Sequence, residues 1–399
     1  MKRAQLAILA AASLVIAACD KPAAPPPPPA PPAGTSTSTS AATSDGASAS
    51  SSASASSAAA TPAVQTSTPA GADPASPDEA KKLRIFCWSE YIPQSVIEEF
   101  SKKTGIDVSV ENFASNEEML AKLAAGGGPY DIIQPSEYVV EALVRENALE
   151  KIDHAAIPNL KNIAPEFLNL PFDPGNAHTV PYMAGTVGIV VNTEVVKDEI
   201  TGFKDLFQEK NKGNIVALDD AREMVTWALL AQGLPVNDLS DENLAKAKAL
   251  LSNWIPLVKV FDSDSPKTSL LNGDVAMGVV WGGEGALLLI ADKKFRWILP
   301  AEGTHLFIDS LAIPKGAKHP GNAMAFMNYI LDPEVSKKLS EEFPYLNPNT
   351  AARALLAPEA LANPASFPTT EQIQSMQMFK DIGERASVVD ELVTTIKAQ

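Results

Sequence analysis

The chain has 399 residues, 45% of them hydrophobic and 20% charged, and its formal net charge is -16 at pH 7. Such an acidic protein repels nucleic acid and anionic membrane surfaces, so we expect neither as a partner. The charge favours a small cation instead.

The first 18 residues are typical of an exported protein. A short basic region precedes the apolar stretch 4–18, which is too short to cross a bilayer comfortably. The stretch ends in Ile16-Ala17-Ala18-Cys19 and resembles a bacterial lipobox, which implies cleavage before Cys19 and lipid on its sulfur. An ordinary signal peptide cut nearby is the alternative. If Cys19 carries lipid, Cys87 has no partner for a disulfide within the chain.

Residues 19–80 are rich in Pro, Ala, Ser and Thr and contain almost no large apolar side chains. Burial within this segment cannot offset the entropy lost on ordering, so the composition predicts a disordered tether. The proline run Pro25 to Pro29 is stiff, and the Ser/Ala part is flexible. We interpret the segment as a spacer that holds a globular body away from a membrane. A low-complexity tail without function predicts the same disorder.

The remaining roughly 320 residues are more than usually fold around a single hydrophobic core, so two lobes are expected. From Leu83 onward, apolar runs of strand length alternate with segments of helical periodicity. The predicted strands of the first series are 83–87, 106–110 and 130–134, and those of the second are 185–191, 213–218, 275–280 and 306–313. Strands that alternate with helices indicate a parallel sheet covered by helices.

Aromatic and acidic residues follow the ends of these strands, where open parallel sheets bind their ligands. The residues at such positions are Trp88, Tyr91, Ser136, Tyr138, Asp220, Glu223, Trp281 and Glu284. Each also has an ordinary explanation: Asp220 and Glu223 have helix N-cap spacing, Glu284 is a first-turn helix charge, and tryptophans pack cores. Asp309 is harder to explain in this way, because an acid inside the apolar run 306–313 needs a partner.

Together these residues describe a site with aromatic walls and anionic ends, which suits a linear organic cation. Aromatic faces attract an ammonium group by roughly 0.5–2 kcal/mol each, and their planes also cover a methylene chain. A carboxylate at each end pairs with an ammonium group, so several acids indicate a diamine or a polyamine.

Motifs of catalysis are missing from the sequence. It contains no nucleophile elbow, zinc-protease motif, Cys-x-x-Cys pair, P-loop or dinucleotide-binding motif, and its four histidines are scattered. We therefore expect no enzyme, no metal site built on imidazole and no cofactor. A cleft of acids that takes a hard cation is the alternative. An enzyme acting on amines or glycans stays as an alternative, because paired acids are the residues that glycan hydrolysis uses.

The sequence from about Leu83 to the C-terminus resembles the periplasmic spermidine/putrescine-binding proteins of ABC importers. The matching stretches run in the same order and cover nearly all of the expected globular part. They are 88–91 (WSEY), 130–133 (YDII), 135–138 (PSEY), 219–223 (DDARE), 278–281 (GVVW), 309–314 (DSLAIP), and Tyr345 before 347–349 (NPN).

The resemblance implies an α/β, two-lobed periplasmic-binding-protein fold of type II. Each lobe would contain a mainly parallel sheet covered by helices, and crossing hinge strands near 185–191 and 307–314 would join the lobes. The implied first lobe comprises 81–185 plus 308–353, and the second comprises 186–307 plus 354–399.

The resemblance also implies a role for each site residue. The aromatic residues that would pack the carbon chain are Trp88, Tyr91, Tyr138, Trp281 and Phe307. The residues that would supply polar contacts are Ser89, Ser136 and Tyr345. The acids that would hold the ammonium groups are Asp220, Glu223, Asp309 and, as a fourth, Glu284.

Three residues depart from the pattern of the family and leave the identity of the amine open. Cys87 stands where a polar residue, commonly Asn, is expected. Phe307 replaces the Trp of spermidine-type members and resembles putrescine-type members. Glu284 stands where putrescine-type members carry an Asp and spermidine-type members have no acid, and its extra carbon would shrink the cleft.

The resemblance implies a monomeric receptor in the periplasm, not an enzyme. It would capture a polyamine between its lobes and deliver it to an ABC permease in the inner membrane, while lipid on Cys19 anchors it to a membrane. Two alternatives keep the fold: the receptor could bind another small organic cation, or it could serve a sensor.

Overall fold

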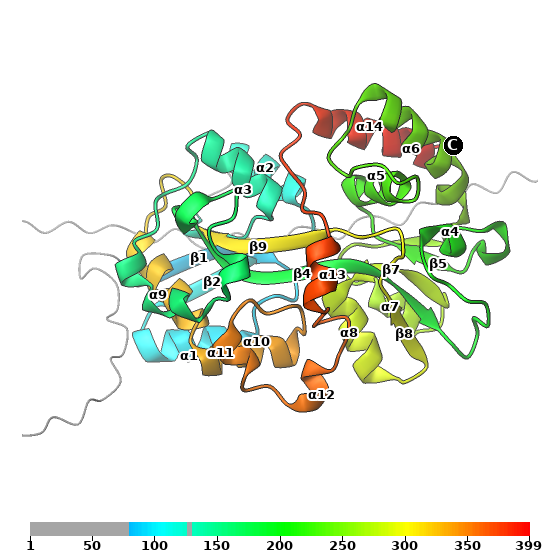
Figure 1. The fold of residues 1–399 in the computed structure, drawn as a ribbon. Helices are drawn as coiled ribbons and strands as arrows, with labels where there is room; N and C mark the ends of the chain where they lie inside the picture. The colour runs from blue at the N-terminus through cyan, green and yellow to red at the C-terminus, as the bar shows by residue number, and fades with distance from the viewer. Residues whose placement is uncertain (1–79, 126–129) are drawn as a thin grey trace, which may run out of the picture. The chain divides into compact units, whose positions relative to one another are not determined.

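The computed structural model describes residues 80–125 and 130–399. The predicted signal peptide, the predicted lipidation site Cys19 and nearly all of the predicted tether lie outside this part. The strands form one nine-stranded sheet in the order β2-β1-β3-β9-β4-β7-β5-β6, with β8 paired to β4. Helices lie on both sides of the strands (Figure 1), so the predicted α/β class is confirmed.

The first group of strands is parallel, as the sequence predicts, and consists of β1 (Lys82–Trp88), β2 (Asp107–Phe113) and β3 (Ile132–Ile133). Its helices are α1 (Gln94–Thr104), α2 (Asn116–Ala124), α3 (Glu137–Arg145), α9 (Pro320–Ile330), α10 (Pro333–Glu342) and α11 (Thr350–Arg353). Helix α1 shows how the local sequence decides these elements. Val96, Ile97 and Phe100 form its buried face, and Gly105 ends it in a left-handed conformation.

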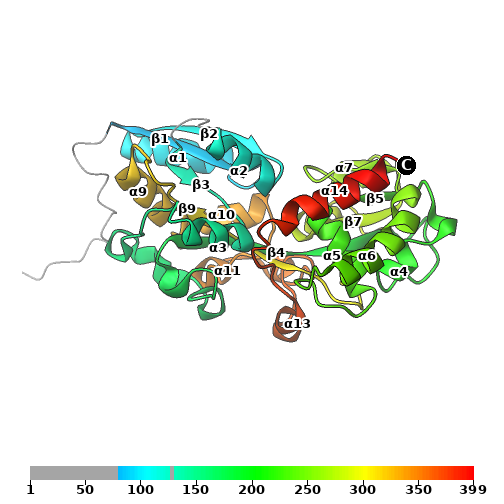
Figure 2. The same ribbon diagram turned by 90° about the horizontal axis from the view of Figure 1, so that it is seen from above.

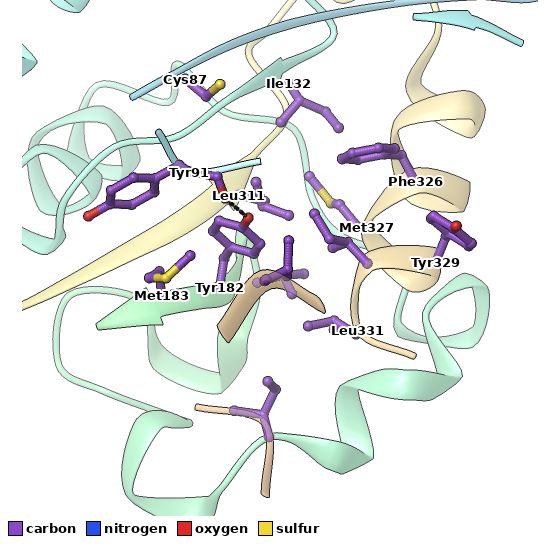
Figure 3. Packing of buried hydrophobic residues seen from close by; sticks show 14 of the residues in the cluster. Cys87, Tyr91, Ile132, Tyr182, Met183, Leu311, Phe326, Met327, Tyr329 and Leu331 are labelled. Atoms are coloured by element: carbon purple, nitrogen blue, oxygen red, sulfur yellow. Dashed lines mark hydrogen bonds between the residues drawn. The ribbon is translucent and has the colours of Figure 1, made fainter. Parts of the chain in front are cut away.

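The core of this group packs β1 and β3 against α9 (Figure 3). Cys87, which stands where the family pattern has a polar residue, is 1% exposed and belongs to this core. Burial raises the pKa of its thiol to about 12, so the thiol stays neutral. Cys87 therefore acts as a small apolar core residue.

The second group is also parallel and consists of β5 (Ile215–Ala217), β6 (Val260–Phe261) and β7 (Met277–Trp281), while β8 (Phe295–Ile298) runs antiparallel to β4. Its helices are α4 (Phe203–Leu206), α5 (Ala221–Leu230), α6 (Asp241–Trp254), α7 (Lys267–Leu271), α8 (Gly282–Ala291) and α14 (Arg385–Lys397). Two short helices, α12 (Pro358–Leu361) and α13 (Thr370–Ser375), precede α14. Apolar side chains of α5, α6 and α14 form a core separate from the first.

Two long strands connect the groups: β4 (Thr179–Asn192) and β9 (Leu306–Ala312) pair antiparallel from Thr179 opposite Ala312 to Thr186 opposite Leu306. All 14 residues of β4 are buried, and its second half pairs with β7 and β8. Figures 1 and 2 show these two strands running side by side between the helices of the two groups. The two-lobed fold with shared strands is thus confirmed, whereas the residue limits of each lobe stay a prediction.

The close approach of β4 and β9 requires a glycine at one position. Gly185 lies opposite Phe307, and a Cβ atom at Gly185 would sit 2.3 Å from Cζ of the Phe307 ring. Any side chain at residue 185 would displace that ring. The absence of a side chain at Gly185 therefore makes room for the Phe307 ring.

Candidate functional site

A cavity of about 640 Å³, open space at its mouth included, is lined by residues of both groups of strands and is called the cleft below. The predicted site residues that line it are Trp88, Ser89, Tyr91, Ser136, Tyr138, Asp220, Glu223, Trp281, Phe307, Asp309 and Tyr345. Residues that the sequence did not single out also line it: Ala114, Asn116, Arg222, Ser263, Asp264, His305 and Phe379. One predicted residue, Glu284, is not part of the lining.

One wall of the cleft is the turn after β1. Glu90 has a φ of 53°, in the left-handed region, which turns the chain sharply between Trp88 and Tyr91. The Tyr182 hydroxyl donates a hydrogen bond to the backbone carbonyl of Tyr91 and holds this turn (Figure 3). The centroids of the Trp88 and Tyr91 rings are 6.5 Å apart, and the Tyr91 ring lies 4.9 Å from that of Tyr345. The aromatic residues at this strand end thus line a cavity.

The other wall comes from β7 and β9. Trp281 is the last residue of β7, and its ring meets the Phe307 ring edge-on at a centroid distance of 5.7 Å. The Trp281 indole N–H donates to the backbone carbonyl of Ser263 at 2.9 Å, which fixes the plane of the ring. The Phe307 ring lies 6.2 Å from Tyr345, so the two walls meet at that residue.

Asp309 is the buried acid between these walls, at 2% exposure. Its Oδ1 accepts a hydrogen bond from Ser136 Oγ at 2.6 Å, and its Oδ2 accepts one from the Tyr91 hydroxyl at 2.9 Å. Burial raises the pKa of Asp309 to about 7, although both hydroxyl groups oppose that rise. The partner that the sequence required for Asp309 is therefore a pair of neutral donors, and the carboxylate charge remains uncompensated.

Asp220 is both a helix N-cap, as its spacing to Glu223 indicates, and a lining residue of the cleft. It is the N-cap of α5, and its Oδ1 accepts from the Glu223 backbone N–H at 2.9 Å. It also lines the cleft. The surrounding protein raises the pKa of Asp220 to about 7 by desolvation, and the nearby charges of Glu223 and Glu117 add to the effect.

Glu223 lies beside Asp220, but both oxygens of its carboxylate already have hydrogen-bond partners within the protein. Its Oε1 lies 2.7 Å from His305 Nδ1, and its Oε2 accepts from the Trp227 indole N–H at 3.1 Å. His305 Nε2 in turn lies 2.9 Å from Oε1 of Glu137, and its ring stacks on Phe379 at 3.5 Å. Sequence reasoning missed His305, although the two-residue period of a strand puts residues 305, 307 and 309 on one face.

Glu284, expected as a fourth acid of the site, is paired elsewhere. It is 3% exposed, and its Oε1 lies 2.7 Å from Lys267 Nζ. The same ammonium group lies 2.6 Å from Glu90 Oε2 and so joins the turn after β1 to α8. Burial raises the pKa of Glu284 to about 7, against the opposing effect of Lys267. The longer Glu side chain therefore does not shorten the cleft, because it is held outside the lining.

The arrangement is suited to holding a cation between aromatic faces. Within residues 80–125 and 130–399, no group of three or more His, Cys, Asp or Glu side chains is placed to hold a metal ion. Asp264, an exposed residue at the rim, accepts a hydrogen bond from Ser89 Oγ and adds a further negative charge. The cleft thus offers rings and carboxylates to an organic cation.

Comparisons with known proteins agree on the family. Residues 95–369 match the family model for bacterial extracellular solute-binding protein. The spermidine/putrescine-binding periplasmic protein of Escherichia coli K12 is 35% identical over 330 residues, which cover 82% of this chain and 95% of that protein. A putrescine/cadaverine-binding protein of Pseudomonas aeruginosa is 32% identical over 82% of this chain and 96% of that protein.

Solved structures agree as well. The spermidine/putrescine ABC transporter substrate-binding protein of Streptococcus pneumoniae is 33% identical and superposes with a TM-score of 0.69. The match covers 80% of this chain and 99% of that one.

Replacing Lys267 by alanine tests the paired state of Glu284. We expect Lys267→Ala to lower the free energy of unfolding by about 2–3 kcal/mol at pH 8, because it leaves a buried carboxylate without its cation. The loss shrinks at pH 5. The folded-state pKa of Glu284 is already raised and rises further without Lys267, so protonation at low pH removes the unpaired charge.

Urea denaturation at the two pH values measures this effect. Lys210→Ala is the matched control, because Lys210 forms an exposed pair with Asp198 and its removal should change stability by less than about 1 kcal/mol. Equal losses for the two variants at pH 8 would contradict the paired state.

Proposed function

Because the chain belongs to the bacterial extracellular solute-binding protein family, we propose that it is a polyamine receptor of an ABC importer. The observation that carries the proposal is Asp309, a buried carboxylate that has only neutral donors and lies between aromatic walls. Similar proteins of Escherichia coli and Pseudomonas aeruginosa are named for the binding of spermidine, putrescine and cadaverine.

The ligand would lie between the walls with one ammonium group on Asp309 and another on Asp220. The rings of Trp88, Tyr91 and Trp281 would cover its methylene chain, and each ring contributes roughly 0.5–2 kcal/mol to binding a nearby cation. Asp309 is held by residues of the first group of strands, whereas Asp220 caps a helix of the second group. A diamine in contact with both acids would therefore favour the closed arrangement of the lobes.

The proposal includes export and delivery. The receptor would reside in the periplasm as a monomer, be anchored by lipid on Cys19, and pass its ligand to a permease in the inner membrane. None of the helices in the described part of the chain has the length and apolar character needed to cross a membrane. The tether of residues 19–80 would give the receptor reach from its anchor.

Calorimetric titration with putrescine and spermidine tests the proposed ligand class. We expect heat of binding and a raised melting temperature with at least one of the two amines, because a ligand that binds only the folded state stabilises it. The absence of both signals with putrescine, spermidine, cadaverine and agmatine would rule out the polyamine receptor.

Asp309→Asn keeps the shape of the side chain and removes its charge. We expect affinity for the bound amine to fall by about 2–5 kcal/mol, which is roughly 30-fold to 5,000-fold, because an ammonium group loses its buried carboxylate. Calorimetry at fixed pH measures the loss. Asp205→Asn changes an acid outside the cleft lining and should leave affinity unaltered. Identical affinities for the two variants would remove Asp309 from the site.

The raised pKa values of Asp309 and Asp220, both about 7, predict pH-dependent binding. Only the carboxylate form pairs with an ammonium group, so affinity should rise from about pH 6 to about pH 8. At about pH 6.5, binding should release protons, because the ammonium groups lower both pKa values. Titrations in buffers of different ionisation enthalpy measure this release. Binding heats that do not depend on the buffer, together with constant affinity over the range, would contradict it.

A further inference from the structure

His305 lies between two carboxylates that come from different groups of strands. Its Nδ1 is 2.7 Å from Oε1 of Glu223 on α5, and its Nε2 is 2.9 Å from Oε1 of Glu137 on α3. The ring is 4% exposed and stacks on Phe379 with an interplanar angle of 10°. The imidazole therefore has fixed partners at both nitrogens and a fixed plane.

Two ionised glutamates would require both imidazole nitrogens of His305 to be donors. Glu137 already accepts from the backbone N–H groups of Ile308 and Phe379, and Glu223 accepts from the Trp227 indole. A neutral imidazole has one N–H, so its other nitrogen would face a carboxylate lone pair at hydrogen-bond distance. With both glutamates ionised, the arrangement is satisfied only when His305 carries a positive charge.

The charged groups around the imidazole agree with this state. Burial alone would lower the pKa of His305, but Glu137 and Glu223 together raise it to about 9. Asp220 and Asp309 also face it electrostatically. The Arg222 guanidinium lies 4.7 Å from the centroid of the Phe379 ring on which His305 stacks. The two carboxylates at hydrogen-bond distance therefore favour the protonated, positively charged form of His305 near neutral pH.

Two of the four acids expected to hold ammonium groups therefore already have a cation. Glu223 is paired with His305, and Glu284 is paired with Lys267. Asp220 and Asp309 form no ion pair with any residue in the described parts of the chain. The cleft accordingly offers two acids that lack a cation.

We propose that His305 determines specificity: its imidazolium occupies the place of a ligand ammonium group beside Glu223, so the cleft prefers an aliphatic diamine to a triamine. The inference rests on the proposed polyamine binding and deepens it. A third ammonium group would have to lie next to a positive charge of the protein, whereas two ammonium groups match Asp220 and Asp309.

Competitive calorimetry with putrescine and spermidine at about pH 7.5 tests the inference on the full chain. We expect the wild type to bind putrescine at least about tenfold more tightly than spermidine. His305→Ala frees the Glu223 carboxylate and opens space beside it, so it should shift the affinity ratio toward spermidine by about tenfold or more. His305→Gln removes the charge while keeping a polar side chain, and it should shift the ratio in the same direction.

His319→Ala is the matched control, because His319 also pairs with a buried acid, Asp131, but lies outside the cleft lining. It should leave the ratio unchanged. Nitrogen-15 NMR of the wild type reports the protonation of the His305 ring directly and does not depend on whether a variant folds. Both ring nitrogens should carry protons at about pH 7.5.

Three results would overturn the inference. They are equal or tighter binding of spermidine by the wild type, an unchanged ratio in folded His305→Ala, and a neutral His305 ring in the NMR spectrum. Failure of the proposed function would look different, because neither amine would then bind the wild type at all.

Discussion

The antiparallel pairing of β4 and β9 is the constraint on which the rest of the structure depends. Every residue of both strands is buried, and β4 contributes hydrogen bonds to the strands of both cores. Because backbone pairing fixes the register, β9 brings Phe307 opposite Gly185 and carries Asp309 to Ser136. The positions of Phe307 and of the buried acid thus follow from strand pairing and not from loop geometry.

A buried carboxylate needs polar partners, and the acids at and beside the cleft have partners of two kinds. Glu223 and Glu284 have cations of the protein as partners. Asp309 has two hydroxyl donors, and Asp220 has a backbone N–H at a helix N-terminus. Neutral donors orient a carboxylate without cancelling its charge, which is why the desolvation of Asp309 still raises its pKa to about 7. The acids with neutral partners, Asp309 and Asp220, can therefore pair with a cation of the ligand. Glu223 and Glu284 already pair with side chains of the protein.

Much of the fold and of the cleft could be predicted from the sequence, because strand ends and apolar runs are local features. Trp88, Asp220 and Trp281 lie at the ends of strands that the apolar pattern indicates, and a shared sheet edge brings such ends together. The short strands β6 and β8 were not predicted. Two and four residues long, they are defined by their pairing partners rather than by a pattern of their own.

The pairing of charges was beyond sequence reasoning for a related reason. Lys267 precedes Glu284 by 17 residues, and His305 is 168 residues from Glu137, so only the folded chain shows these contacts. The length of Glu284 consequently gave a wrong expectation about cleft size. Its extra carbon reaches toward Lys267 and does not enter the lining.

Phe307 and His305 are two residues apart, at and just before the start of β9, and both line the cleft. The Phe307 ring is enclosed by Trp281 at 5.7 Å, His305 at 6.1 Å and Tyr345 at 6.2 Å. The ring can lie in this position because residue 185 is glycine, since a Cβ atom there would sit 2.3 Å from Cζ. A phenyl ring at residue 307 and an imidazole at residue 305 therefore line the same part of the cleft. If His305 is charged as proposed, the phenyl ring limits the space and the imidazolium limits the positive charge that a ligand can bring to this part of the cleft.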